Sequence, residues 1–208
     1  MKIIQYRVEM NDIEQIVDNL IKAIPFEGVS DNTLLKVCND LQLTASFCKF
    51  QNGIYSALEH ISDNFNKMMI KKLSSIDLNA LKVREKIKLA IKIYLENYAE
   101  LQNYREFIKN IISFSLQNPW FATKLLYNRV DNTWRGICDT STDFNYYTKR
   151  LTLSSVYFST VLYFIDDYSQ GFVDTLSFLD RRINNIIAFH EFKKKIKLPI
   201  LKPFDIKL

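Results

Sequence analysis

Glycine and proline, the residues that most often mark turns, are scarce in this chain, with four of each in 208 residues. A β-sandwich or an α/β fold of this length needs more turn residues than that, so the scarcity favours long helices. Hydrophobic residues make up 48% of the chain, which is ample for a packed core, and a charged fraction of 25% argues against disorder. The sequence therefore predicts an all-α protein.

Apolar residues recur at helical spacing along the chain and indicate about nine helices. The first is expected to reach Ile24 and to be stopped by Pro25. Ser30 and Thr44 are expected N-caps of two short helices, which gives an N-terminal helix-turn-helix-like unit. The later helices are expected at about 53–73, 79–98, 101–116, 119–134 and 141–166, with a last one ending near 195. We predict three parts: the helix-turn-helix-like unit over 1–75, a larger helical domain over 76–195, and a basic apolar tail over 196–208.

No residue pattern in the sequence favours catalysis or metal binding. Cys38, Cys48 and Cys138 form no C-x-x-C pair, so we expect buried, reduced thiols instead of disulfides or zinc ligands. Neither His60 nor His190 has a second ligand at metal-binding spacing, and phosphate-binding glycine motifs are missing. We therefore expect a protein that is not an enzyme and that needs no metal or cofactor.

The helix-turn-helix-like unit raises a second possibility, a ligand-responsive transcriptional regulator. Its second short helix offers Thr44, Ser46 and Lys49, but no Arg, Asn or Gln for bidentate contacts to bases. Acids also outnumber bases between Asp12 and Asp40, which weakens any attraction to phosphates. We expect no nucleic-acid partner and keep the regulator as the alternative function.

The expected helix over 141–166 is unusual because its second half is apolar or small on every side. Such a helix is buried on several sides, so a neighbouring core helix, a dimer partner or a bound apolar ligand must cover the additional face. If a ligand covers it, an apolar cavity of ~300–1,000 Å³ is expected nearby. The side chains predicted to surround this single cavity are Trp120, Trp134, Leu151, Val156 and Phe158.

The start of the same helix contains two adjacent tyrosines, which point about 100° apart on a helix. Phe144, Tyr147 and Leu151 share one face and are predicted to point inward. Tyr146 and Arg150 form an i, i+4 pair and are then predicted to point outward. The alternative is that both tyrosines belong to the core.

The net charge of +5 is concentrated at the end of the chain, where six lysines stand against Glu191 and Asp205. The side chains expected to contact a membrane surface are Lys193, Lys194, Lys195, Lys197 and Phe204. The alternative is a strap packed against the body. No apolar stretch reaches the ~20 residues that span a bilayer, and the N-terminus has no signal or transit pattern. We expect a cytoplasmic protein peripheral to the inner membrane of a bacterium, and a mitochondrial matrix protein less so.

The segment Asp139-Thr-Ser-Thr-Asp-Phe-Asn-Tyr-Tyr-Thr-Lys-Arg150 resembles the signature D-x-S-T-D-F-N-W-Y-T-K-R of the Coq-nine family, lipid-binding proteins needed for ubiquinone biosynthesis. The resemblance extends to Phe178-Leu-Asp-Arg-Arg182 and, more loosely, along the whole chain. It implies a TetR-like helical fold, which bacterial repressors also use. It further implies a homodimer that holds an isoprenoid lipid or phospholipid and presents it to the di-iron hydroxylase that acts on demethoxyubiquinone.

The resemblance also suggests roles for individual residues. Region 76–195 becomes a lipid-binding and dimerisation domain, and Phe144 and Tyr147 join the five predicted lipid-binding side chains. The residues predicted to bind the hydroxylase lie at the start of the helix: Asp143, Asn145, Tyr146 and Arg150. A simpler interpretation of the same residues is a helix start followed by a solvated face.

Overall fold

Helices make up all the regular structure in residues 2–138 and 144–196, the part of the chain that the computed structural model describes. The predicted all-α fold is therefore confirmed, while the TetR-like detail and the three-part division stay predictions. In chain order the elements are α1 (Lys2–Glu27), α2 (Asp31–Asp40), the 3₁₀ helix η1 (Thr44–Lys49), α3 (Ile54–Ser74), α4 (Val83–Ala99), α5 (Tyr104–Gln117), α6 (Pro119–Gly136), α7 (Phe144–Ile165), the 3₁₀ turn η2 (Gln170–Phe172) and α8 (Val173–Ile196).

Several helix ends follow the local signals in the sequence. Ser30 is the N-cap of α2, because its hydroxyl accepts a hydrogen bond from the backbone N–H of Thr33 at 3.1 Å. Pro119 occupies the first turn of α6, where its missing N–H has no helical partner to lose. The prediction that Pro25 stops the first helix is wrong, since α1 continues to Glu27 and ends at Gly28, whose positive φ of +74° suits a residue without a side chain.

The N-terminal unit is held together by acidic side chains of α1 and α2. Asp12 of α1 accepts hydrogen bonds from Ser46 Oγ at 3.0 Å and Lys49 Nζ at 2.9 Å. Asp31 accepts one from the backbone N–H of Ile54 at 2.7 Å, which ties α2 to the start of α3. The second short helix of the unit is the 3₁₀ helix η1, and two of its three candidate base-reading side chains are bound to Asp12. This geometry gives no support to a regulator that reads DNA.

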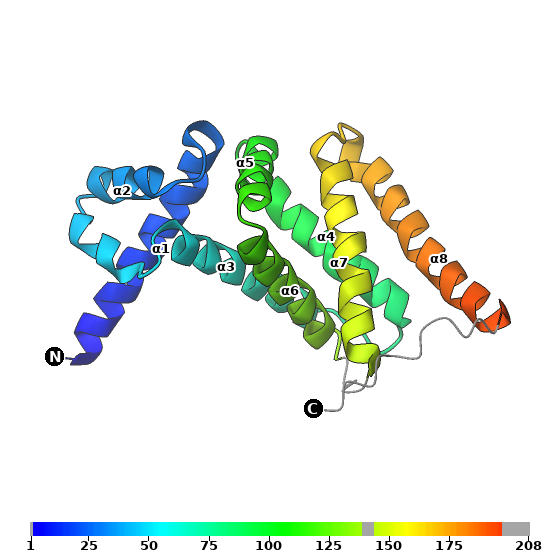
Figure 1. The fold of residues 1–208 in the computed structure, drawn as a ribbon. Helices are drawn as coiled ribbons and strands as arrows, with labels where there is room; N and C mark the ends of the chain where they lie inside the picture. The colour runs from blue at the N-terminus through cyan, green and yellow to red at the C-terminus, as the bar shows by residue number, and fades with distance from the viewer. Residues whose placement is uncertain (1, 139–143, 197–208) are drawn as a thin grey trace, which may run out of the picture.

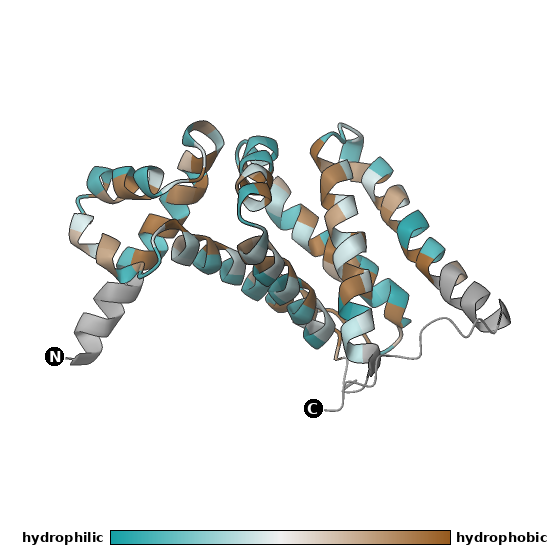
Figure 2. Cartoon of the chain, in the orientation of Figure 1, coloured by the Kyte–Doolittle hydropathy of each residue, from teal (hydrophilic) through white to brown (hydrophobic). Residues whose placement is uncertain are grey.

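The rest of the chain is a helical array in which α7 lies at the centre of the second half. Figure 1 shows α7 beside α8 at the end of the molecule opposite α1 and α2, and α7 also packs against α4, α5 and α6. In Figure 2 few residues of α7 have the strongly hydrophilic colour, in contrast to α8. The predicted burial of this helix on several sides does not hold for one apolar side: Val156, Thr160 and Phe164 are buried, whereas Phe158 and Leu162 are exposed.

The turn between α7 and α8 is organised by the buried carboxylate of Asp167. Its two oxygens accept hydrogen bonds from the backbone N–H and the hydroxyl of both Ser169 and Thr175, at 2.5–2.8 Å. Arg105 of α5 donates to the backbone oxygens of Ile165 and Asp167 at 3.0 and 2.7 Å. Burial alone would raise the pKa of Asp167, but the four hydrogen bonds outweigh it and lower the pKa to about 2.

We expect Asp167→Asn to lower the free energy of unfolding at pH 7 by about 2 kcal/mol, because an amide cannot accept all four hydrogen bonds. Since the folded-state pKa is depressed, this contribution is complete above about pH 4, the ordinary range of the carboxyl group in the unfolded chain. It is lost as the pH falls from there toward about 2. Urea unfolding of both proteins at pH 7 and across pH 4–2 measures it.

The matched control is Asp166→Asn, which changes the exposed neighbouring acid and should alter stability by less than about 0.5 kcal/mol. A gap between wild type and Asp167→Asn that stays constant down to pH 2 would contradict the role given to this carboxylate.

Candidate functional site

Two apolar grooves lie on either side of α7. The first, here called the α8 groove, has a volume of about 390 Å³ and is walled by α4, α6, α7 and α8. The second, the α5 groove, also has a volume of about 390 Å³ and is walled by α4, α5, α6 and α7. Both volumes fall at the lower end of the range for small-molecule sites, ~300–1,000 Å³.

The α8 groove has almost entirely apolar walls and a buried polar group. Leu153 and Val156 come from α7, and Ile183 and Ile186 come from α8. Trp134 of α6 also lines the groove, is 5% exposed, and its Nε1–H has no hydrogen-bond acceptor among the described residues. A buried N–H donor without an acceptor is unfavourable, so the indole beside this groove has one hydrogen bond that the described residues leave unmade.

The mouth of the α8 groove carries positive charge. Arg84 of α4 and Lys149 of α7 both line it, and Lys149 Nζ lies 5.2 Å from the ring centroid of Trp134. A cation over an indole face is a favourable arrangement that also orients the ring. The lining of the groove therefore combines apolar walls, the indole of Trp134 and two basic side chains.

The α5 groove ends at a buried arginine surrounded by aromatic rings. Arg129 of α6 donates to Tyr98 Oη at 3.0 Å and to Ser62 Oγ at 3.1 Å, and its guanidinium carbon lies 4.7 Å from the ring centroid of Tyr94. Burial raises the pKa of Tyr94 to about 12 and raises that of Tyr157 well above its usual value. These two phenols are therefore neutral near pH 7.

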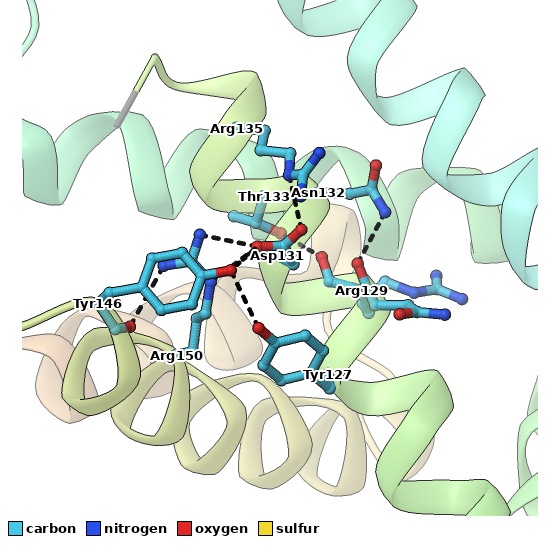
Figure 3. Close-up of polar contacts among 9 residues, drawn as sticks. Tyr127, Arg129, Asp131, Asn132, Thr133, Arg135, Tyr146 and Arg150 are labelled. Atoms are coloured by element: carbon cyan, nitrogen blue, oxygen red, sulfur yellow. Dashed lines mark hydrogen bonds and ion pairs between the residues drawn. The ribbon is translucent and has the colours of Figure 1, made fainter. Parts of the chain in front are cut away.

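A second polar cluster braces α6 against α7 (Figure 3). Asp131 of α6 accepts from Arg150 of α7 through both Nε and Nη2, at 2.8 and 2.7 Å, and from Arg135 at 2.6 Å. Tyr146 Oη donates to Asp131 at 3.2 Å and lies 3.0 Å from Tyr127 Oη. The hydrogen bond to Tyr127, with smaller effects from burial and from Asp131, raises the pKa of Tyr146.

The predicted single lipid cavity is wrong, because α7 separates its members. Trp134 and Val156 line the α8 groove, whereas Phe158 lines the α5 groove. Trp120 is 89% exposed, Leu151 is 76% exposed, and both line neither groove. The side chain of Phe144 lies outside the described residues.

The predicted orientation of the start of α7 is also wrong. Tyr147 and Leu151 were expected to point inward, but they are 68% and 76% exposed. Tyr146 and Arg150 were expected to point outward, but Arg150 is 4% exposed and both side chains bind Asp131. The reason is that Arg150 requires an acidic partner, and the partner is on α6. Two other predicted partner-binding residues, Asp143 and the side chain of Asn145, lie outside the described residues.

The remaining sequence predictions concern the cysteines and the tail. Cys38 is buried, but Cys48 and Cys138 are exposed, so the expectation of three buried thiols holds for one of them. Within the described part of the chain, no helix is both long enough and apolar enough to cross a bilayer. The predicted membrane contacts all fall outside the described side chains: Lys193, Lys194, Lys195, Lys197 and Phe204.

Two charged residues on which the site depends, Arg129 and Asp131, were not predicted from the sequence as site residues. A signal for Arg129 was present, because it lies three residues after Leu126 and one before Val130, within the apolar face of α6. A charge inside such a face indicates a buried partner or ligand. The spacing of Asp131 carries no comparable signal, since its partner is distant in the sequence.

Comparison with known proteins points to one family. The COQ9 family model matches residues 121–190, which cover most of α6, all of α7 and most of α8, the helices that carry the Asp131 cluster and part of the walls of both grooves. The probable ubiquinone biosynthesis protein coq9, mitochondrial, of Dictyostelium discoideum is 27% identical over 199 residues, covering 88% of this chain and 62% of that protein. The mitochondrial ubiquinone biosynthesis protein COQ9-A of Xenopus laevis is 24% identical over 206 residues, covering 92% of this chain and 62% of that protein.

A shorter and stronger match is found with the mitochondrial ubiquinone biosynthesis protein COQ9 of Rattus norvegicus, 42% identical over 81 residues. That match covers 39% of this chain and 26% of the rat protein. The chain thus spans less than two thirds of the length of these relatives. The family match, the long alignments and the signature at Asp139–Arg150 agree, and together they support the COQ9 family.

Proposed function

We propose that the protein is a lipid-binding accessory protein of ubiquinone biosynthesis, and not itself an enzyme. In this proposal it holds an isoprenoid quinone intermediate in the α8 groove and presents it to the hydroxylase that acts on demethoxyubiquinone. The similarity to the COQ9 family supports the role in ubiquinone biosynthesis, since the relatives are named for that process.

The observation that carries the lipid-binding part is the buried N–H of Trp134, which has no acceptor among the described residues and belongs to a side chain that lines an otherwise apolar groove. An isoprenoid tail would fit the walls formed by α7 and α8, because both surfaces are apolar. A quinone ring adds carbonyl oxygens, which are acceptors for the indole N–H. Tail and head of this ligand class thus match the two kinds of surface in the groove.

The first test is mass spectrometry of an organic extract of the purified protein, which should contain an isoprenoid quinone or a biosynthetic precursor of one. A second test is quantitative. We expect Trp134→Phe to weaken binding of a ubiquinone with a short isoprenoid tail by about fivefold, the value of one neutral hydrogen bond. Isothermal titration measures the affinity.

The matched control is Trp120→Phe, which makes the same change at a fully exposed indole outside both grooves. Its affinity for the short-tailed quinone should equal that of the wild type. An equal loss of quinone affinity in both variants would contradict the proposal. It would also be contradicted if the extract contains no lipid and titration detects no binding of the quinone.

The proposed partners would use an exposed apolar stripe along α7. Tyr147, Leu151, Phe158 and Leu162, spaced by four, seven and four residues, are 41–76% exposed, and we call them the α7 seam. Large exposed apolar side chains gathered on one helix are typical of protein interfaces. We propose that the α7 seam contacts the hydroxylase. A homodimer, membrane contact by the lysine-rich end and a place at a bacterial inner membrane stay predictions.

A further inference from the structure

The α5 groove differs from the α8 groove in the chemistry of its inner end. Its walls are apolar, with Ile108, Ile112, Leu126 and Val161 among the lining residues. At the inner end the lining changes to the guanidinium-bearing Arg129 and the phenol-bearing side chains of Tyr98 and Tyr157. An elongated molecule in this groove would therefore meet hydrocarbon along most of its length and polar donors at one end.

Arg129 is a buried positive charge that no acidic residue balances in the described part of the chain. It is 7% exposed, and its two hydrogen bonds within that part go to the neutral hydroxyls of Tyr98 and Ser62. Neither bond uses Nε, although the guanidinium carries five N–H donors. Buried charges in proteins are normally paired with an opposite charge, because an unpaired one loses its hydration without compensation.

Two acids, one beside Arg129 in the sequence and one near its hydrogen-bond partner Ser62, are paired with other residues. Asp131 lies on the opposite side of α6, since two helical residues are about 200° apart, and it binds Arg150 and Arg135. Glu59 pairs with Lys124 at the surface. The ring faces of Tyr94 and Tyr157 attract the cation but leave its net charge unchanged, because both phenols stay neutral.

We propose that the α5 groove is a second ligand site, which takes a single-chain amphiphile with an anionic head, a carboxylate or a phosphate. The head oxygens accept hydrogen bonds from Arg129 and Tyr157, and the apolar chain lies along α5 and α6. Charge-assisted hydrogen bonds of this kind are about twice as strong as neutral ones, so an anion is preferred over an alcohol of the same length. The volume of about 390 Å³ suits one chain better than the two of a phospholipid.

The test compares palmitate with hexadecanol, which has the same chain and a neutral head. For the wild type we expect palmitate to bind tenfold or more tightly than hexadecanol, as measured by displacement of a fluorescent fatty acid at pH 8. Arg129→Met should bring palmitate down to the affinity of hexadecanol and leave hexadecanol itself unchanged. Equal binding of the two ligands by the wild type, or a preference that survives in Arg129→Met, overturns the proposal.

Two controls localise the effect. Arg84→Met removes a cation that lines the α8 groove and should leave the preference for palmitate intact. Ala122→Phe fills the α5 groove from α6 and should weaken both ligands. A preference that falls in Arg84→Met instead of Arg129→Met would assign the anion to the other groove and overturn the proposal.

Two further ligands distinguish the contribution of the anionic head to binding from that of the apolar chain. Hexadecyl phosphate should bind like palmitate, whereas inorganic phosphate should not compete with either at millimolar concentration. If inorganic phosphate competes as strongly as hexadecyl phosphate, the site takes free anions and the lipid assignment is overturned. Trp134→Phe should leave palmitate binding unchanged, so failure of the quinone proposal is distinguishable from failure of this one.

One measurement needs no substitution at Arg129 and therefore holds even if Arg129→Met does not fold. Palmitate labelled with ¹³C at its carboxyl carbon is titrated by NMR while bound to the wild-type protein. A head beside a buried cation should ionise at lower pH than free palmitate does. A bound carboxyl group that titrates at or above the pH of the free one overturns the proposal.

Discussion

Asp131→Asn is expected to lower the free energy of unfolding by about 3 kcal/mol or more, the largest effect of any single substitution that we predict. The carboxylate joins Arg150 of α7, which is 4% exposed, to Arg135 and Tyr146. Without the negative charge, the guanidinium of Arg150 stays buried between two helices with no other acid of the described residues bound to it. Removing one partner of a buried pair costs more than the pair contributes, because the other charge stays desolvated.

Urea or thermal unfolding of three variants tests this role of Asp131. Glu59→Gln removes the acid of the exposed pair with Lys124 and should change stability by no more than about 1 kcal/mol. The double variant Asp131→Leu with Arg150→Met replaces both charges by apolar groups and should recover most of the loss. A double variant as unstable as Asp131→Asn would show that the loss of stability comes from the lost geometry of the Asp131 cluster and not from the unpaired charge.

The orientation of α7 illustrates what hydrophobic periodicity can and cannot decide. Phe144, Tyr147 and Leu151 form a regular apolar face, but so do Leu153, Val156 and Phe164 further along the same helix. When a helix is apolar on most sides, several rotations about its axis bury similar areas. Arg150 selects one of these rotations of α7, because its charged side chain must reach Asp131. That requirement depends on a contact between two helices, which no spacing within α7 records.

The division of the predicted cavity into two grooves has a similar origin. The residue types were right for an apolar site, since Trp134, Val156 and Phe158 all line a groove. Two positions apart on a helix, Val156 and Phe158 point about 200° away from one another and cannot share a pocket. That separation was available from the sequence. The place of Trp120 was not, because its exposure depends on where the neighbouring helices end.

The helix order and most boundaries were accessible to sequence reasoning because they depend on local chemistry. Ser30 and the Asn118-Pro119 pair mark helix starts that the structure confirms. The predicted boundary was wrong at Pro25, because the helix continues past this proline. It was also wrong where a helix begins later in the chain than its apolar pattern does. The pattern predicted a start at Asn79, but α4 begins at Val83, after Lys82 donates its backbone N–H to Glu85 at 2.7 Å.

The start of α7 belongs to the segment that resembles the COQ9 signature, and two of its apolar side chains are not buried. Tyr147 and Leu151 are one helical turn apart and are 68% and 76% exposed, so their apolar area faces solvent in the isolated chain. Their neighbours Tyr146 and Arg150 hold α7 against α6 through Asp131, which fixes the direction in which the α7 seam points. The partner contact first predicted for Tyr146 and Arg150 is therefore better assigned to the seam.

Leu151→Lys should weaken binding of the demethoxyubiquinone hydroxylase by about 30-fold or more, a hot-spot effect of ~2 kcal/mol, because the charge would have to be desolvated at the interface. Its melting temperature should barely change, since the side chain is exposed in the free protein. Met68→Lys makes the same kind of change on α3 and should bind like the wild type. A pull-down titration measures the affinity, and light scattering reports the oligomeric state of each variant. Loss of a dimer with unchanged hydroxylase binding would assign the α7 seam to self-association instead, and no change in either measurement would remove its role as an interface.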